Sequence, residues 1–268
     1  MESTKNTKDS GNFLNTAVEL ALHAGQLIKR MAKQSHTITF KGAVDLVTEA
    51  DVASEALVIA GIKERFPDHG ILAEEKGIEQ GESEYLWIID PLDGTTNYAH
   101  GFPVYGVSIA LEYRGEITVG VVYEPNLDEL FTAEKGKGAF LNGAPIRVSE
   151  TRELDRSLLA TGFPYNFRTD PDRIIKLFTG FSLNAQGIRR AGAATIDLIS
   201  LACGRFDGFW EFGLKPWDMA AGGLIAAEAG ARITRMEGRS YDIRVPEIVA
   251  SNGFIHDQML AVILRSFS

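Results

Sequence analysis

We predict an α+β fold, because three parts of the chain carry different hydrophobic periodicities. Residues 13–31 repeat apolar side chains at helical spacing. Residues 104–148 alternate β-forming residues with turns at 114–115, 125–126, 135–136 and 142–143, which is typical of an antiparallel meander. The remaining residues mix helical and strand patterns. The chain of 268 residues is 45% hydrophobic, enough for one large domain or two closely packed ones.

The first half should begin with an amphipathic helix over 13–31 and a short strand over 37–40. A second helix is expected to start after Thr48, a plausible N-cap, with Asp51 three residues later resembling a capping box. Pro67-Asp68-His69-Gly70 should end this helix near Phe66, and 71–73 should form a strand that ends at Glu74-Glu75.

The second half should contain strands over 158–161, 206–211 and 248–251. Helices are expected over 170–181, 193–203, 218–229 and 256–266. The pattern changes near residue 148, so we predict two parts, 1–148 and 149–268. No linker rich in Gly, Ser or Pro separates them, and we therefore expect the parts to pack tightly.

Composition narrows the possible partners and the compartment. The net charge of −9, without a dense Lys/Arg cluster, argues against direct binding of nucleic acid. Cys203 is the only cysteine and lies in an apolar helical pattern, which suits a core thiol in a reducing compartment. The first ten residues are polar, and no apolar run is long enough to cross a membrane. We expect a cytoplasmic protein with no membrane partner.

Residues 87–97 carry the strongest chemical signal in the chain. An apolar run ends at Asp90 and Asp93, and a Gly94-Thr95-Thr96 turn follows at once. Carboxylate oxygens are hard ligands that suit Mg²⁺, Mn²⁺ or Ca²⁺. Backbone N–H groups at a helix start can hold a phosphate. Acids beside a phosphate cradle point to metal-assisted phosphoryl chemistry.

The run Asp90-Pro91-Leu92-Asp93-Gly94-Thr95-Thr96-Asn97 resembles the signature of the inositol monophosphatase family of Mg²⁺-dependent, lithium-sensitive phosphatases. Four further segments match in the expected order: 41–51, Glu74-Glu75, 192–194 and the region of Glu211 to Gly222. The resemblance implies a layered α/β/α/β/α sandwich. The active site would lie between the two halves, with most metal ligands in the first.

The resemblance also implies the metal ligands. Asp90 would bridge two metals, while Glu74, Asp93, Asp218 and the carbonyl of Leu92 would each bind one, with Glu75 as a possible supporting acid. Mg²⁺ is the implied cofactor, Mn²⁺ a possible substitute, and Li⁺ and Ca²⁺ expected inhibitors. Without the resemblance, plainer interpretations stay open. The Glu pair could be solvated surface, and Asp93 and Asp218 could be helix N-caps.

Catalytic and substrate roles follow from the same resemblance. Asp51 and Thr95 would position or activate the attacking water, although Asp51 could instead stabilise its helix start. Lys41 is a possible contact of the phosphate or of a metal-bound water. The expected substrate contacts are Gly94, Thr95, Thr96, Gly192, Ala193, Ala194 and Glu211. Glu211 would bind substrate hydroxyls. The alternative that Glu211 is an ordinary surface acid at the end of a strand is equally open.

The resemblance therefore predicts a homodimeric phosphomonoesterase that hydrolyses inositol monophosphate or a related polyol or sugar phosphate. Two alternatives stay open. The substrate could be that of another relative, such as fructose 1,6-bisphosphate, histidinol phosphate, NADP or a 3′-phosphoadenosine compound. The chain could also bind a protein partner as a scaffold, in addition to its catalytic role.

Overall fold

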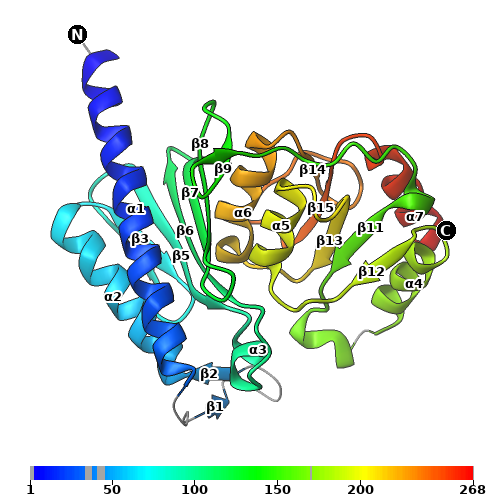
Figure 1. The fold of residues 1–268 in the computed structure, drawn as a ribbon, viewed down its shortest axis with the longest axis horizontal. Helices are drawn as coiled ribbons and strands as arrows, with labels where there is room; N and C mark the ends of the chain where they lie inside the picture. The colour runs from blue at the N-terminus through cyan, green and yellow to red at the C-terminus, as the bar shows by residue number, and fades with distance from the viewer. Residues whose placement is uncertain (1–2, 34–37, 41–45, 170, 268) are drawn as a thin grey trace.

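The computed structural model describes residues 3–33, 38–40, 46–169 and 171–267, and they form five layers (Figure 1). Helices α1 (Ser3–Met31) and α2 (Glu49–Arg65) cover the outer face of a large sheet. Helices α5 (Ala194–Ala202) and α6 (Pro216–Glu228) lie between this sheet and a smaller one. Helices α4 (Pro171–Ser182) and α7 (His256–Phe267) form the last layer. The predicted α+β sandwich of helix and sheet layers is confirmed.

The large sheet has eight strands in the order β10-β9-β8-β7-β6-β5-β3-β4. Strands β6 to β10 form the antiparallel meander predicted over 104–148; β5 also pairs antiparallel with β6, whereas β3 and β5 are parallel. A separate pair, β1 (Ile38–Phe40) and β2 (Leu46–Thr48), precedes α2. The bounds of the eight strands are β3 Gly70–Ala73, β4 Gly77–Glu79, β5 Tyr85–Asp93, β6 Gly106–Tyr113, β7 Glu116–Glu124, β8 Glu129–Glu134, β9 Ala139–Leu141 and β10 Ala144–Pro145.

The smaller sheet has five strands in the order β12-β11-β13-β15-β14. Their bounds are β11 Leu158–Thr161, β12 Gly187–Arg189, β13 Gly208–Phe212, β14 Arg232–Thr234 and β15 Glu247–Ser251, and three short helices complete the chain, α3 Thr95–Ala99, η1 Leu154–Arg156 and η2 Tyr165–Arg168. The sequence analysis missed β2, β4, β12 and β14, because three residues are too few to display a period. It also placed the start of α1 ten residues late.

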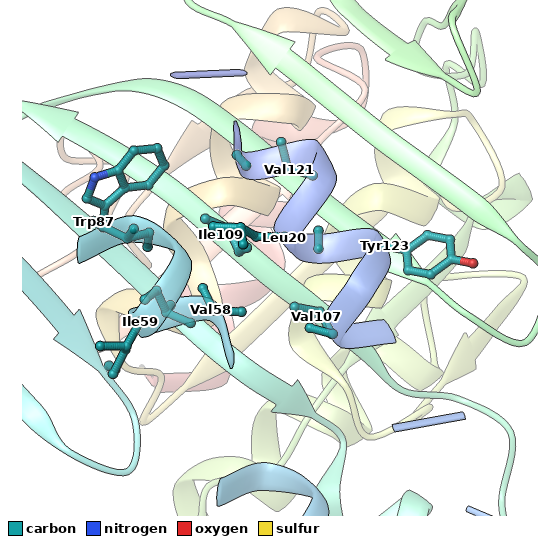
Figure 2. Close-up of a cluster of buried hydrophobic side chains, with 14 of the residues drawn as sticks. Leu20, Val58, Ile59, Trp87, Val107, Ile109, Val121 and Tyr123 are labelled. Carbon is teal, nitrogen blue, oxygen red and sulfur yellow. The ribbon is translucent and has the colours of Figure 1, made fainter. Parts of the chain in front are cut away.

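One hydrophobic core joins the outer helices to the large sheet. Figure 2 shows Leu20 of α1 and Val58 and Ile59 of α2 against side chains of three strands. The strand residues labelled there are Trp87, Val107, Ile109, Val121 and Tyr123, and each is at most 4% exposed. This burial fixes β5, β6 and β7 as a rigid platform, and β5 carries the predicted acids at its end.

A second core joins the two sheets through the middle helix layer. It combines Ile88 and Val122 of the large sheet with Leu198 of α5, Ile225 of α6 and Phe209 of the smaller sheet. The two halves of the chain therefore share buried surface, although their division into two domains at 148/149 stays a prediction. Among the described residues, no helix combines the length and apolar character needed to cross a membrane.

The middle layer packs closely because α6 is built from small residues. A Cβ added at Gly120 of β7 would lie 2.8 Å from the carbonyl oxygen of Ala221 on α6. Only a glycine lets helix and strand backbones approach this closely. The close contact holds α6 against the large sheet, and the first turn of this helix carries Asp218.

Candidate active site

A β-bulge at the end of β5 brings Asp90 and Asp93 to the same cavity. In a regular strand, residues three apart point to opposite faces. Here Asp90 pairs with Ser108 and Asp93 with Gly106, so β5 has one residue more than β6 over this stretch. Pro91, which has no N–H to donate to the ladder, lies within the bulge. The Asp-Pro-Leu-Asp spacing thus directs two carboxylates to one place.

The bulge opens onto a cavity of about 300 Å³ between the two halves of the chain. Most of the residues predicted for the site line this cavity, namely Glu74, Asp90, Leu92, Asp93, Gly94, Thr95, Thr96, Gly192, Ala193, Ala194, Glu211 and Asp218. Asp51 and Glu75 are not among the lining residues, and Lys41 lies outside the described residues. The structure therefore brings together acids from β5, β13, α6 and the turn that follows β3.

Asp93 connects the two halves by capping a helix far along the chain. Its Oδ2 accepts hydrogen bonds from the backbone N–H of Thr195, at 2.7 Å, and from the Thr195 hydroxyl. Thr195 lies in the first turn of α5, whose N-cap Ala193 has no side chain able to cap. The interpretation of Asp93 as the N-cap of the helix that follows it is wrong. That helix, α3, has Gly94 as its N-cap.

Asp218 reaches the cavity from the first turn of α6. The helix begins at Pro216, and Asp218 Oδ2 accepts from the N–H of Lys215 at 2.7 Å, which satisfies a backbone donor at the start of the helix. Asp218 is thus the third residue of the helix rather than its N-cap. It is half-buried, so one side of its carboxylate stabilises the helix while the cavity remains within reach.

The acids of the cavity disfavour one another's charge. Asp90 is 1% exposed, and burial, followed by the charges of Glu74, Asp93 and Asp218, raises its pKa well above the usual value. Burial and then Asp93 raise the pKa of Asp218 in the same way. Two or more like charges in a buried site are costly without a compensating cation. This arrangement favours a bound cation of high charge.

Thr95 lies between Asp51 and the end of β5. Its Oγ1 is 2.9 Å from Asp51 Oδ1 and 3.1 Å from the carbonyl oxygen of Leu92. The other Asp51 oxygen accepts from the N–H of Thr48, at 2.8 Å, and from its hydroxyl, at 2.6 Å. The predicted capping box is confirmed, and Asp51 also contacts Thr95. Burial raises the pKa of Asp51, and these hydrogen bonds partly offset that effect.

The turn after Asp93 has a conformation that requires glycine. Gly94 has φ of 89°, and a Cβ there would lie 2.8 Å from the carbonyl oxygen of Val104. Thr95 and Thr96 follow in the first turn of α3, where backbone N–H groups have no partner within the helix. The turn therefore presents N–H and hydroxyl donors to the cavity beside the acids.

Glu211 enters the cavity from β13, a central strand of the smaller sheet. Burial raises its pKa well above the usual value, Asp197 and Asp218 add to this, and Arg190 opposes it.

Asp197 of α5 was missed by the sequence analysis. It is 1% exposed, and both of its carboxylate oxygens lack a hydrogen-bond partner among the described residues. The sequence could have revealed this residue, because Asp197 interrupts the apolar run Ile196-Asp197-Leu198-Ile199.

Two other residues, Ser54 and Glu55, support the site without lining the cavity. Ser54 Oγ donates to the carbonyl oxygen of Pro91 at 2.7 Å, which fixes the bulge to α2. Glu55 is 1% exposed and accepts from the backbone N–H of Glu75 at 2.8 Å, which orients the chain just after Glu74. Sequence reasoning missed Ser54 and Glu55, since nothing in a helical pattern distinguishes a polar residue that faces another element.

The donor set fits a hard divalent cation. Four carboxylates and the Leu92 carbonyl supply oxygen ligands only, which is the chemistry that Mg²⁺ prefers. Within the described part of the chain, no three His, Cys, Asp or Glu side chains already form a metal cage.

The layered fold and its acidic interlayer cavity are the arrangement that the sequence predicted for a metal-dependent phosphatase. The family model described as the inositol monophosphatase family matches residues 9–267, and the chain belongs to this family. An inositol-1-monophosphatase of Synechocystis is 47% identical over 94% of this chain and 88% of its own length. A Nus factor SuhB of Vibrio cholerae is 45% identical over 90% and 91%. The solved inositol monophosphatase of Anabaena superposes with a TM-score of 0.87 at 44% identity, covering 95% of this chain and 96% of that one.

Proposed function

We propose that the chain hydrolyses inositol monophosphate, or a related polyol or sugar phosphate, with Mg²⁺ as cofactor. The observation that carries this proposal is the convergence of Glu74, Asp90, Asp93 and Asp218 on one cavity beside the Gly94–Thr96 turn. Membership in the family and the 47% identical inositol-1-monophosphatase support the choice of substrate.

The proposed division of labour follows from the contacts. Glu74, Asp90, Asp93, Asp218 and the Leu92 carbonyl would hold Mg²⁺, with Mn²⁺ as a substitute. Bound Mg²⁺ lowers the pKa of a water and stabilises negative charge on the leaving alkoxide. The backbone N–H groups of Gly94, Thr95 and Thr96 and the hydroxyl of Thr96 would hold the phosphate oxygens.

Thr95 and Asp51 would orient the attacking water. A threonine hydroxyl has one proton, and here two acceptors compete for it, the Asp51 carboxylate and the Leu92 carbonyl. When Thr95 donates to Asp51, its oxygen lone pairs are left to accept from a water in the cavity. Hydrolysis requires such a water in line with the departing oxygen, and holding it there lowers the barrier.

The opposite wall of the cavity would select the alcohol. Gly192, Ala193 and Ala194 precede or begin α5 and provide little side-chain bulk, which leaves room for a polyol. Glu211 on β13 would accept hydrogen bonds from substrate hydroxyls. Lys41 and Glu75 remain possible supporting residues.

A Mg²⁺-dependent phosphate-release assay tests this proposal. The panel contains inositol 1-phosphate, fructose 1,6-bisphosphate, histidinol phosphate, NADP and a 3′-phosphoadenosine compound. The highest kcat/KM is expected on inositol 1-phosphate, with inhibition by Ca²⁺ and by Li⁺ but not by Na⁺ at matched ionic strength. If phosphate is released only from a nucleotide, the proposed polyol substrate is wrong. If phosphate is released from none of the esters, the proposed phosphatase activity is refuted.

A protein-binding role is a second candidate, in addition to catalysis. The similarity to a relative named Nus factor SuhB favours it. An Asp90→Asn variant separates the two roles, because it should lose hydrolysis while its surface stays unchanged. If the variant complements every phenotype of a deletion strain, catalysis is dispensable there and the binding role is primary.

A homodimer and a cytoplasmic location also stay proposals, supported by the family resemblance. Light scattering coupled to size exclusion checks the first, with a dimer expected near twice the chain mass of 29.3 kDa. Fractionation of the native cells checks the second.

A further inference from the structure

A second and larger cavity, of about 730 Å³, borders α6 on a different face. Its helix residues are Ala220, Gly223, Leu224 and Ala227. Their spacing of three and four places them on one stripe of the helix. This cavity shares no lining residue with the active-site cavity. It is therefore a separate site, and its volume lies within the range of small-molecule pockets.

The wall of the second cavity combines apolar side chains with polar and charged ones. Its apolar part is formed by Leu224 of α6, Ile117 of β7, Ile233 of β14 and Ile243. Tyr241 also lines it, and its hydroxyl donates to the carbonyl oxygen of Met219 at 3.0 Å, which leaves the ring as part of the wall. An occupant should therefore have an apolar body.

The charged side chains that line the second cavity differ in whether they have an ion-pair partner within the protein. Lys135 pairs with Glu116 at 2.7 Å. Arg244 donates to both carboxylate oxygens of Glu112, each at 2.8 Å, in a bidentate pair. The positive charges of Lys135 and Arg244 thus have partners within the protein. Asp242 also lines the cavity and accepts from the N–H of Arg244 at 2.9 Å.

Arg235 lacks such a partner. Its Nε is buried and has no hydrogen-bond acceptor, and its guanidinium takes part in no ion pair among the described residues. The backbone is fixed in a turn, in which the N–H of Arg235 donates to Arg239 and its carbonyl accepts from Gly238, both at 2.9 Å. Arg235 is only partly buried, so a ligand in the cavity would meet the terminal nitrogens of its guanidinium, which favour a carboxylate, sulfonate or phosphate group.

We propose that this cavity binds a small organic anion, with its apolar body between Leu224 and Ile233 and its anionic group on Arg235. This proposal is independent of the proposed catalytic function and substrate, because none of the residues of the second cavity lines the active-site cavity. The chain as a whole carries a net charge of −9, so selection of an anion depends on this local arginine.

The test uses 8-anilinonaphthalene-1-sulfonate as the probe, an aromatic anion whose fluorescence rises in apolar sites. Saturable binding at one site per chain is expected, with Kd on the order of 10–100 μM for a ligand of this size. Arg235→Gln should weaken binding roughly tenfold or more, since a hydrogen bond to a charged group is lost. Ala227→Trp should abolish binding by filling the cavity from an exposed helix position.

Three controls separate this site from the rest of the surface. Arg239→Gln removes the same charge four residues away, from an exposed arginine paired with Glu237 at 2.8 Å, and should leave Kd unchanged. Leu183→Ser removes a large apolar side chain that is 80% exposed, and should also have no effect. Addition of Mg²⁺ with inorganic phosphate should not displace the probe.

Several results would overturn the proposal. These are the absence of saturable binding, equal effects of Arg235→Gln and Arg239→Gln, displacement by Mg²⁺ with phosphate, or undiminished binding to a folded Ala227→Trp protein. Far-UV circular dichroism and the melting temperature establish that each variant is folded. If Ala227→Trp does not fold, the comparison of the two arginine variants decides alone.

Discussion

Thr95 Oγ1 lies 2.9 Å from Asp51 Oδ1, although the two residues come from different helices, the first turns of α3 and α2. Asp51 is fully buried and Thr95 is 7% exposed. The contact therefore links the start of α2 to the acids of β5 inside the protein. A water held by this pair would be fixed by residues that cannot easily move.

Replacing Thr95 with alanine should depress kcat on every phosphomonoester by about 10²–10⁴-fold, since the water loses its orienting hydroxyl. Thr95→Ser keeps the hydroxyl and should retain most of the activity. The check is kcat for both variants under saturating Mg²⁺. Equal activity of the alanine and serine variants would remove Thr95 from the catalytic machinery.

Replacing Asp90 with asparagine should lower the rate by about 10³-fold or more, because the most buried of the clustered carboxylates loses its charge. Titration of Mg²⁺ against kcat measures the effect, and raising Mg²⁺ should not restore the rate. Asp257→Asn, at an exposed position on α7, serves as the control. Wild-type turnover by a folded Asp90→Asn protein would contradict the metal assignment.

Replacing Glu211 with glutamine should change the order of substrates rather than slow all of them. A hydroxyl contact matters only where the substrate carries that hydroxyl, and its loss costs about 1.5–3 kcal/mol, or roughly ten- to a hundredfold. The measurement is kcat/KM on inositol 1-phosphate, fructose 1,6-bisphosphate and an ester without neighbouring hydroxyls. Glu247→Gln on the adjacent strand β15 is the matched control. A uniform decrease would place Glu211 in the catalytic or structural set.

His256 should make stability depend on pH. Its Nδ1 lies 2.9 Å from Ser251 Oγ and its Nε2 3.0 Å from Thr234 Oγ1. The Thr234 hydroxyl donates to the carbonyl of Arg235, so Nε2 carries the proton of a neutral ring. Burial, followed by the charge of Arg232, lowers the pKa of His256 from 6.5 to about 4.

Because the unfolded chain binds this proton first as pH falls, the contribution of His256 to stability is complete above pH 6.5. It should be lost progressively down to pH 4, and the total is about 3 kcal/mol. Urea unfolding at several pH values measures the free energy of unfolding. The difference between wild type and His256→Gln should follow this curve, whereas His23→Gln, at an exposed position on α1, should leave the pH dependence unchanged. A pH-independent difference would refute the role of His256.

Periodicity and turn residues predicted the meander, α2 and the helices of the second half, because long elements repeat their pattern several times. The segment 87–97 indicated the site, since acids after an apolar run are costly unless compensated. The sequence could not show that Asp93 caps α5, because this depends on a contact between distant segments. Nor could it show the cavity beside Arg235, which exists only where α6 meets the turn before Arg239.

The shared core between the sheets has a consequence for synthesis. Ile88, Val122 and Phe131 leave the ribosome well before Leu198 and Ile225, the helix residues that cover them. At typical rates of roughly 5–20 residues per second, the interval lasts several seconds. During that time the inner face of the large sheet is an apolar surface without its cover. A nascent chain stalled in this interval should be prone to aggregation, and the order of translation itself exposes the molecule to that hazard.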